Sequence, residues 1–484
     1  MVDDRHKTPV TRIDAGDELQ IIPLKPVDQW RPLDNIRSLL FLAMRKPLNE
    51  DALRDALNQL IRRHLPILGA RIELKKSDLE YHLPKSFSST YQLFDWTNRT
   101  ISSTLGESDL FPQAHESASG AFFAPVNIPE MEKAWTPSSW PVERKFEKPG
   151  APLLFVHITK YTNATIVALN LPHAVSDQMG FGSMIKAWIR VVAGETPMEF
   201  LDLSPSALDG PKLSQKELRK KGEYRILSSR EQATKIIPFI SDLIFHSKET
   251  RKTLFLPVEV VDDLRKRCTD VLKKKYGKET LPLTNADILT GILAKFAHLD
   301  HRRPKMLTLN STINMRGRHP ALPANKSYLH NALSFAVSRL PIASNTPLAE
   351  VAYKNRLAVT EQLQLKSIER SLAVTKELYK RKYHIHVVEP SDISYAVTNW
   401  CGAWRDIDFG PAIIRGEGAA ATDENSTAVP LIFGHSLQRN YPTRYNAQIM
   451  CKADGGYWCD FTAHIKAMEC VERLLKSDPK LQSL

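Results

Sequence analysis

A histidine that follows an apolar run is the residue with the clearest catalytic potential in this chain. His173 lies two residues after the apolar run 164–171, and three residues separate it from Asp177. Gly180 and Gly182 follow close behind. Since an imidazole titrates near neutral pH, a histidine that the fold holds in place but leaves open to a substrate can act as a general base. The alternative interpretation is a buried structural histidine at the end of a strand.

The elements on either side of His173 are expected to hold it in place. Two runs of apolar and β-branched residues, 153–160 and 164–171, are separated by the turn-forming residues 161–163. This pattern predicts a β-hairpin. An amphipathic stretch over residues 182–192 predicts a helix after the loop. The sequence therefore places His173 between the second strand of a hairpin and a helix.

The rest of the chain alternates between helical and strand-like patterns. Apolar side chains recur at helical spacing over residues 49–63, where Asn49 or Glu50 can cap the helix. We expect a strand over residues 67–72 and a long irregular region over 84–150. In the second half, the expected elements are strands at 252–256, 306–314, 393–398, 447–450 and 456–462, a helix that Thr284 or Asn285 caps, and helices at 258–275, 347–378 and 463–475.

Length and composition indicate an α/β protein of more than one domain. The 484 residues, 42% of them hydrophobic and 25% charged, are enough for two large domains with ordinary globular composition. Residues 194–250 are rich in proline and charge, which is typical of a connection between domains. The predicted division is a first domain over residues 1–210, a linker over 211–250 and a second domain over 251–484.

Net charge and cysteine content limit which binding partners and which cellular compartment we expect for this protein. The formal net charge is +12, but the Lys and Arg residues are mostly dispersed and no nucleic-acid-binding motif is present, so we expect no nucleic acid partner. The five cysteines form no CxxC pair, and we expect neither a disulfide framework nor a metal site. The first residues carry no apolar signal segment, and no run of 18 apolar residues exists. We therefore expect a cytoplasmic protein without a membrane span.

Several ordered segments resemble the BAHD acyltransferases, a family of coenzyme A-dependent enzymes. The family's His-x-x-x-Asp-Gly segment is similar to His173-Ala-Val-Ser-Asp177, and its Asp-Phe-Gly-Trp-Gly segment is similar to Asp408-Phe409-Gly410. Gln178 and the pair Pro411-Ala412 depart from these two patterns. The other similar segments are Leu65-Pro66-Ile67-Leu68-Gly69-Ala70-Arg71, Asn314-Met315-Arg316-Gly317-Arg318, Tyr328-x-x-Asn331-Ala332 and Thr398-Asn399-Trp400.

This resemblance implies a fold and an activity. The fold would comprise two chloramphenicol-acetyltransferase-like α/β domains with a channel at their interface. His173 would take the proton from a hydroxyl or amine of a hydrophobic secondary metabolite while that atom attacks the thioester of acyl-CoA, with acetyl-CoA as the expected cosubstrate. Neither an acyl-enzyme nor a metal would be needed, and the resemblance implies a monomer. The aromatic residues within 84–150 and the apolar run 428–433 suggest a lipophilic acceptor.

The resemblance also implies roles for other residues. Asp177 would turn away from the base and pair with Arg316 as a scaffold, and Asp408 with Gly410 would shape a turn. Trp400 or a nearby hydroxyl would stabilise the oxyanion. The coenzyme A contacts expected from the family are Thr284, Thr398 and Trp400. The lysines of 273–275 could meet the 3′-phosphate, but a solvated helix face is the favoured interpretation of this cluster.

Two other functions fit the same fold. Condensation domains of peptide synthetases carry a second histidine directly before the His-x-x-x-Asp segment, where this chain has Pro172. Such a domain would form or cyclise an amide or ester. A non-catalytic binding protein is the alternative of a different class. Coenzyme A binding without turnover would favour that interpretation.

Overall fold

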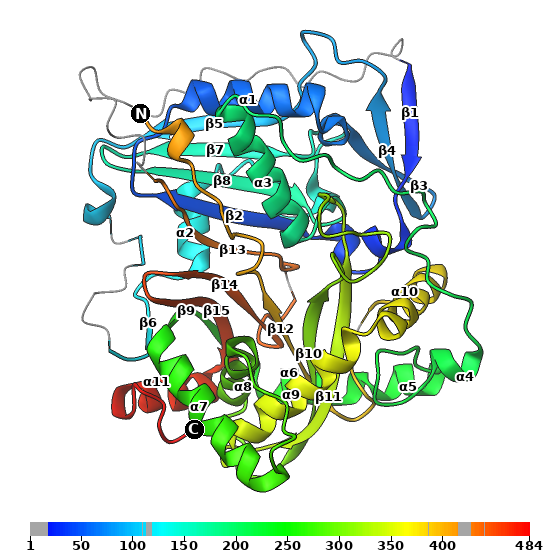
Figure 1. The fold of residues 1–484 in the computed structure, drawn as a ribbon, viewed down its shortest axis with the longest axis vertical. Helices are drawn as coiled ribbons and strands as arrows, with labels where there is room; N and C mark the ends of the chain where they lie inside the picture. Colours follow the sequence, from blue (N-terminus) through cyan, green and yellow to red (C-terminus); the bar gives the residue numbers. More distant parts are fainter. Residues whose placement is uncertain (1–17, 109, 113–118, 386, 415–426, 440) are drawn as a thin grey trace.

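The computed structural model shows a mixed α/β protein built on two large sheets (Figure 1). It describes residues 18–108, 110–112, 119–385, 387–414, 427–439 and 441–484. One sheet has five strands in the order β13-β2-β8-β7-β5, and the other has seven in the order β11-β10-β12-β14-β15-β9-β6. A small third sheet combines β1 (Leu19–Pro23), β4 (Asp78–Pro84) and β3 (Arg71–Lys75).

The five-stranded sheet contains the predicted hairpin. Strands β7 (Phe155–Lys160) and β8 (Thr165–Pro172) pair antiparallel, with Phe155 opposite Asn170. Helices α1 and α3 cover the front of this sheet in Figure 1 and α2 lies behind it. The remaining elements of this layer are β2 (Arg37–Met44), β5 (Asp95–Thr100), β13 (Leu431–His435), α1 (Glu50–Arg63), α2 (Ile128–Trp135) and α3 (Gln178–Val192).

The seven-stranded sheet is formed mainly by the second half of the chain. Its strands are β6 (Phe122–Phe123), β9 (Glu249–Pro257), β10 (Lys305–Asn314), β11 (Leu333–Ile342), β12 (Ile393–Asn399), β14 (Asn446–Ala453) and β15 (Gly456–His464). The helices are α7 (Val258–Tyr276), α8 (Asn285–Ala297), α9 (Leu348–Gln362), α10 (Leu365–Lys380) and α11 (Ile465–Ser477). Strands β10, β12 and β14 run parallel to one another, so their amino ends share one edge of the sheet.

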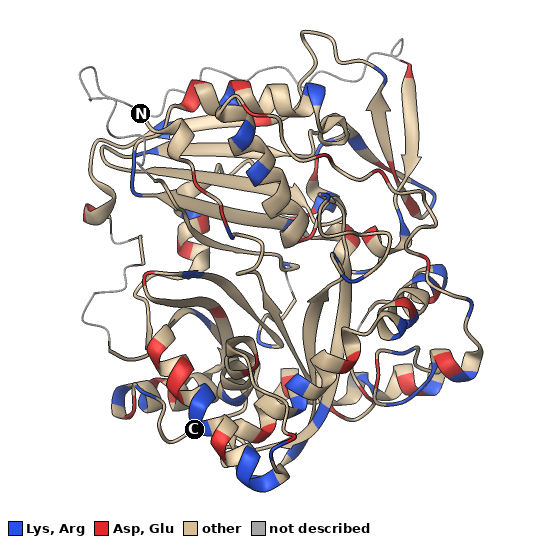
Figure 2. Ribbon diagram, viewed as in Figure 1, with Lys and Arg blue, Asp and Glu red and all other residues tan. Residues whose placement is uncertain are grey.

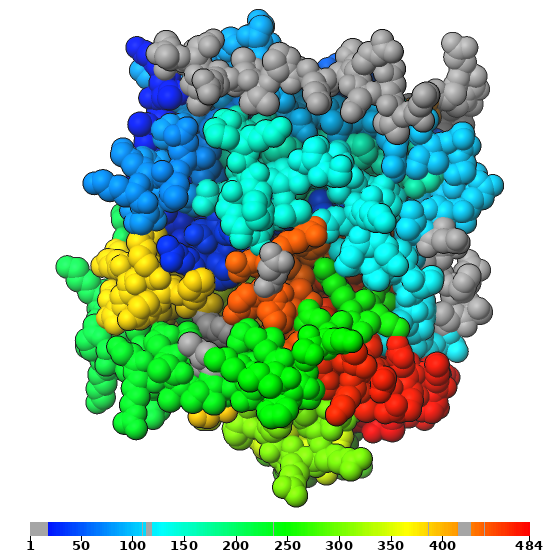
Figure 3. All heavy atoms as spheres, turned by 180° about the vertical axis from the view of Figure 1, so that it is seen from behind, coloured from blue at the N-terminus to red at the C-terminus, as the bar shows by residue number. Residues whose placement is uncertain are grey.

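Each large sheet takes a strand from the other half of the chain. Strand β13 pairs with β2, with Phe433 opposite Phe41, and β6 pairs with β9. In the run 428–433, which suggested a lipophilic acceptor, residues 431–433 thus belong to a buried strand. Viewed from behind, the N-terminal half forms the upper part of the molecule and the C-terminal half the lower part (Figure 3). The division into 1–210, 211–250 and 251–484 stays a prediction.

The predicted linker is structured and attached to the C-terminal half. It contains α4 (Gln215–Leu218), α5 (Ser229–Thr234) and α6 (Ile236–Phe245). Arg225 forms an ion pair with Glu389 at 2.7 Å, and Arg444 donates to Asp242 on α6 at 2.8 Å.

Some expected elements were wrong in type or extent. Residues 67–72 do not form one strand, because a 3₁₀ turn over Pro66–Gly69 precedes β3. The stretch 347–378 is two helices, α9 and α10, separated at Gln364, whose ψ of 138° is extended. Helix α9 packs on α8 and β11, whereas α10 contacts the 3₁₀ turn Pro26–Asp28 as well as β11 and α9. Strand β11 was not predicted.

Charged residues are dispersed along the described chain, and the ribbon in Figure 2 shows Lys and Arg positions interspersed among those of Asp and Glu. Within the described ranges, no helix combines the length and the apolar character that a membrane crossing requires.

Candidate active site

The backbone of His173 is held by both halves of the chain. His173 follows the last residue of β8, and its N–H donates to the Ile36 carbonyl at 2.9 Å. Its carbonyl accepts a hydrogen bond from Asn331 Nδ2 at 2.8 Å. Since Ile36 and Asn331 come from opposite halves, the position of His173 depends on how the halves fit together.

The imidazole of His173 is half-buried and has a free nitrogen. Its Nδ1 has no hydrogen-bond partner among the described residues. Burial lowers the pKa of His173 below its usual value, and the charge of Asp177 opposes that shift only partly. The ring is therefore neutral near pH 7 and can accept a proton.

Asp177 is a structural carboxylate. Its side chain is 2% exposed. One carboxylate oxygen accepts from the Gly180 N–H at 2.9 Å and caps α3, while the other accepts from Arg316 Nη1 at 3.0 Å and from the Ala332 N–H at 2.8 Å. Because both oxygens are bonded in this way, the carboxylate does not orient the imidazole of His173 as a triad aspartate would.

Arg316 connects three segments around this carboxylate. Besides the Asp177 ion pair, its guanidinium donates to the carbonyl oxygens of Tyr328 and His330 at 2.6–3.2 Å. It also donates to Asn314 Oδ1 at 3.1 Å. The ion pair between the two halves is thus embedded in a hydrogen-bond network.

A second polar clamp was not predicted from the sequence. One oxygen of Asp28 accepts from both the backbone N–H and Nδ2 of Asn331, each at 2.9 Å. Burial raises the pKa of Asp28 to about 6. Asp28 therefore positions the amide that holds the His173 carbonyl. No spacing pattern could have indicated it, because its partner lies in the other half of the chain.

Two glycines allow α3 to approach the C-terminal half. A Cβ at Gly180 would lie 1.8 Å from the Leu329 carbonyl oxygen, and one at Gly182 would lie 2.3 Å from the Ala403 carbonyl oxygen. Larger residues at either position would push the halves apart beside His173.

Gln178 departs from the family pattern without disturbing the turn. It is the first residue of α3 and so does not need the conformational freedom of glycine. Its Nε2 donates to Ser436 Oγ at 2.6 Å and lies 3.3 Å from Ser38 Oγ. The side chain thereby links α3 to both β2 and the segment after β13.

Thr398 and Trp400 lie at and just beyond the carboxyl end of β12. Thr398 Oγ1 is buried and has no hydrogen-bond partner among the described residues. The Trp400 backbone N–H donates to the Ile449 carbonyl at 2.9 Å, so that amide is already used. The free hydroxyl of Thr398 is thus a better candidate donor than the Trp400 amide.

Thr284 and Asp408 occupy other places in the fold. Thr284 is exposed at the start of α8, where it forms a capping box with Asp287. Asp408 accepts from the N–H groups of Gly410 at 2.9 Å and Ala428 at 2.6 Å, which closes a turn. This turn lies close to α1 and α3, on the outer layer of the five-stranded sheet.

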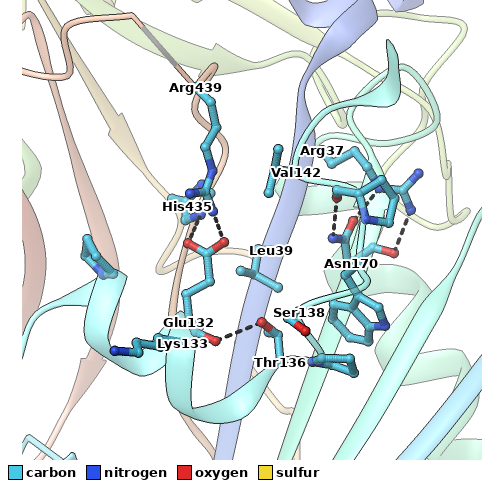
Figure 4. A pocket seen from close by; sticks show the side chains of 14 residues that line it. Arg37, Leu39, Glu132, Lys133, Thr136, Ser138, Val142, Asn170, His435 and Arg439 are labelled. Carbon is cyan, nitrogen blue, oxygen red and sulfur yellow. Dashed lines mark hydrogen bonds and ion pairs between the residues drawn. The ribbon is translucent and has the colours of Figure 1, made fainter. Parts of the chain in front are cut away.

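A pocket of about 240 Å³ lies on the α2 side of the five-stranded sheet (Figure 4). Its wall includes Asn170 on β8, but His173 does not line it. Glu132 points toward both His435 and Arg439 in this pocket, and burial lowers the pKa of His435 to about 3. The pocket is adjacent to the strand that carries His173 without containing the base.

Although no metal site was expected, three potential metal ligands gather at one place in the described part of the chain. His246, Asp300 and His464 place ligand atoms within 4.8 Å of one another. Because the three residues are far apart in the sequence, no local spacing pattern could have predicted this cluster. Their position is remote from His173 and is treated separately below.

Comparisons with known proteins identify the class of fold. A family model described as "Transferase family" matches residues 140–416, which is more than half of the chain. The structure is similar to that of F. graminearum TRI101 complexed with coenzyme A and deoxynivalenol, with a TM-score of 0.66 and 13% identity over 96% of this chain and 98% of that chain. The fold is the two-domain, chloramphenicol-acetyltransferase-like fold of acyltransferases.

Within that class, the chain belongs to the Transferase family, the BAHD acyltransferases. It is 24% identical over 409 residues to acetyltransferase adrJ of Penicillium rubens, covering 78% of this chain and 79% of that protein. It is also 25% identical over 478 residues to O-acetyltransferase PaAT-2 of Phomopsis amygdali, covering 91% and 94%.

Proposed function

We propose that this protein transfers an acyl group, most simply acetyl, from acyl-CoA to a hydroxyl or amine of a hydrophobic secondary metabolite. The observation that carries the proposal is the His173 imidazole, which is neutral, half-buried and unpartnered at Nδ1 while its backbone is held from both halves. The acetyltransferase names of the fungal relatives and the coenzyme A bound in TRI101 support this chemistry.

The proposed reaction is a direct transfer. His173 takes the proton from the acceptor O–H or N–H as the heteroatom attacks the thioester carbonyl carbon. The Thr398 hydroxyl donates to the oxyanion that forms. When the tetrahedral species collapses, the carbon–sulfur bond breaks, and the imidazolium returns the proton to the departing coenzyme A thiolate. The products are the ester or amide and free coenzyme A.

The environment of the thiols supports a route without an acyl-enzyme. Burial raises the pKa of Cys401 to about 12 and that of Cys268 to about 11. A thiol with so high a pKa is almost entirely protonated near neutral pH and is a poor nucleophile. Asp177, with both oxygens bonded, serves in this proposal to hold the His173 loop rather than to move protons.

Acyl-CoA would contact Thr284, Thr398 and Trp400, with the lysines of 273–275 near its phosphates. The free amides at the start of α8, the helix that Thr284 caps, favour an anionic group there. We further propose that the protein acts as a cytoplasmic monomer. Equilibrium sedimentation tests the last point.

A thiol-release assay with acetyl-CoA and longer acyl-CoAs, against a panel of hydroxylated polyketide, terpenoid and alkaloid acceptors, tests the proposal. The expected result is acceptor-dependent release of coenzyme A without acylated protein in intact mass spectra. Acylation of the protein itself would contradict direct transfer. Coenzyme A binding without turnover on any acceptor would favour a binding protein, and turnover only with carrier-bound acyl groups would favour a condensation enzyme.

A further inference from the structure

Four of the chain's 15 histidines gather at the edge of the seven-stranded sheet that is remote from His173. Together with neighbouring side chains, they line a cavity of about 560 Å³ beneath α6. We call this edge, where β10 begins at Lys305 and β12 begins at Ile393, the distal edge. The opposite end of β10 leads to Arg316, and ten residues of strand span about 30 Å. The cavity is therefore separate from the proposed acyl-transfer site.

His464 is the least satisfied of these side chains. It is 6% exposed, and neither Nδ1 nor Nε2 has a hydrogen-bond partner among the described residues. Nε2 lies 3.3 Å from Asp300 Oδ1, close enough for an ion pair when the histidine is protonated, and this buried oxygen has no hydrogen bond of good geometry to any described residue. Burying several polar atoms without hydrogen bonds destabilises the folded state, so we expect His464 and Asp300 to bind a further partner.

His246 approaches the same point with one nitrogen already occupied. Its Nδ1 lies 2.8 Å from Asp242 Oδ1, and its ring stacks on that of His464 with centroids 4.1 Å apart. When a carboxylate accepts the Nδ1 proton, the Nε2 lone pair is left free to bind a metal. This arrangement of carboxylate and histidine is common around protein metal ions.

We propose that His246, Asp300 and His464 bind one divalent transition-metal ion of the zinc type. Their ligand atoms all lie within 4.8 Å of one another. Donors at 2.0–2.2 Å from one ion are separated by about 3 to 4.4 Å, so the set needs a small closure. The stacked rings of His246 and His464 must also turn about their side-chain bonds, so that both nitrogen lone pairs point at the ion. Two imidazoles and a carboxylate suit zinc better than magnesium or calcium, which prefer oxygen ligands.

The positions of the three residues allow that small closure. His246 directly follows α6, Asp300 lies in the turn after α8, and His464 ends β15. A bound ion would therefore join α6, from the connection between the halves, to the sheet of the C-terminal half. Of the cations that line the cavity, Arg444 is paired with Asp242 and Glu249, and Arg339 with Asp392. Lys235 and Lys305 also line the cavity and add positive charge that an ion must overcome.

Zinc titration of the full-length, tag-free chain after chelator treatment tests the proposal. A competing fluorescent chelator measures the affinity, and cobalt substitution reports the ligand geometry through its visible absorption. The expected result is one equivalent of zinc and a rise in melting temperature on binding, because an ion that binds only the folded state stabilises it. Absence of stoichiometric binding, or cobalt spectra of the free hexaaqua ion, would overturn the proposal.

Matched variants locate the ion. Asp300→Asn keeps the side-chain shape but removes the charged ligand, and His246→Gln removes one imidazole; each is expected to abolish stoichiometric zinc binding. Asp242→Asn, which leaves all three ligands in place, is expected to weaken binding about 10- to 100-fold. His64→Gln, at the end of α1, is the control and retains wild-type affinity. Equal zinc affinity in Asp300→Asn, His246→Gln and the wild type would overturn the assignment.

Discussion

The polar side chains near the two ends of strand β10 differ in how completely their atoms are hydrogen-bonded. At the end near Asn314, the charged side chains Asp177 and Arg316 have several hydrogen-bond partners each, and the Nδ1 of the neutral imidazole beside them has none in the described part of the chain. At the distal edge, the carboxylate of Asp300 and the imidazole of His464 both have atoms without a hydrogen-bond partner among the same described residues. A general base needs one free nitrogen on a rigid support, whereas a metal site needs several free donors that converge.

The largest expected effect is loss of acyl transfer on removing the base. His173→Ala is expected to lower kcat/KM by about 10²- to 10⁴-fold, the usual contribution of general-base catalysis. The melting temperature is expected to stay near that of the wild type, because the His173 Nδ1 has no hydrogen-bond partner to lose among the residues that the structure describes. His64→Ala is the control. Undiminished thiol release by His173→Ala would show that acyl transfer does not depend on the base at this end of β10.

Breaking the scaffold at the same end should act on stability. Arg316→Ala leaves the buried Asp177 carboxylate without its counter-charge and is expected to cost about 3–5 kcal/mol of unfolding free energy. Urea denaturation measures this loss. Arg318→Ala, at an exposed position two residues later, is the control and is expected to change stability by less than about 0.5 kcal/mol. An unchanged midpoint for Arg316→Ala would contradict the scaffold role.

A smaller effect is expected from the contact between the halves. Gly180→Ala places a Cβ against the Leu329 carbonyl and is expected to cost about 1–3 kcal/mol by overpacking. Gly106→Ala serves as its matched control, because no described residue other than its chain neighbours lies within 4 Å of the new Cβ. Thermal melts of both variants compare the two sites. Equal melting temperatures would mean that α3 tolerates displacement from the C-terminal half.

The smallest expected effect distinguishes two roles of Thr284, namely helix capping and coenzyme A binding. Thr284→Ala and Asn49→Ala each remove an N-cap side chain and are expected to cost about 1 kcal/mol of stability. Only Thr284→Ala is expected to raise the KM for acetyl-CoA, since the start of α8 is the proposed coenzyme contact. Steady-state kinetics on both variants measures the difference. Equal KM values would restrict Thr284 to its capping role.

Local patterns predicted the elements that carry the base. The β7–β8 hairpin and α1 follow from apolar runs, a turn and an N-cap, which act between near neighbours in the chain. Helix α3 begins four residues before the predicted start at Gly182, because Asp177 caps it. The Asp177–Arg316 ion pair was expected only through family resemblance, since residue spacing alone carries no information on partners so far apart.

Non-local pairing accounts for what the sequence did not reveal. Strand β13 joins the sheet of the other half, Asp28 clamps Asn331, and His246 meets His464 only after the chain has folded. Periodicity describes which face of an element is apolar, but not which distant segment covers it.

The pH dependence of kcat/KM is the most direct test of the claim that neutral His173 accepts the acceptor's proton. Because burial lowers the pKa of His173 below 6.5, kcat/KM should stay constant as the pH falls to 6.5. At lower pH it should decline, as the imidazole becomes protonated and can no longer accept a proton. The residual activity of His173→Ala should lack this acid limb. An acid limb that survives unchanged in His173→Ala, or activity that rises as the pH falls, would contradict the account.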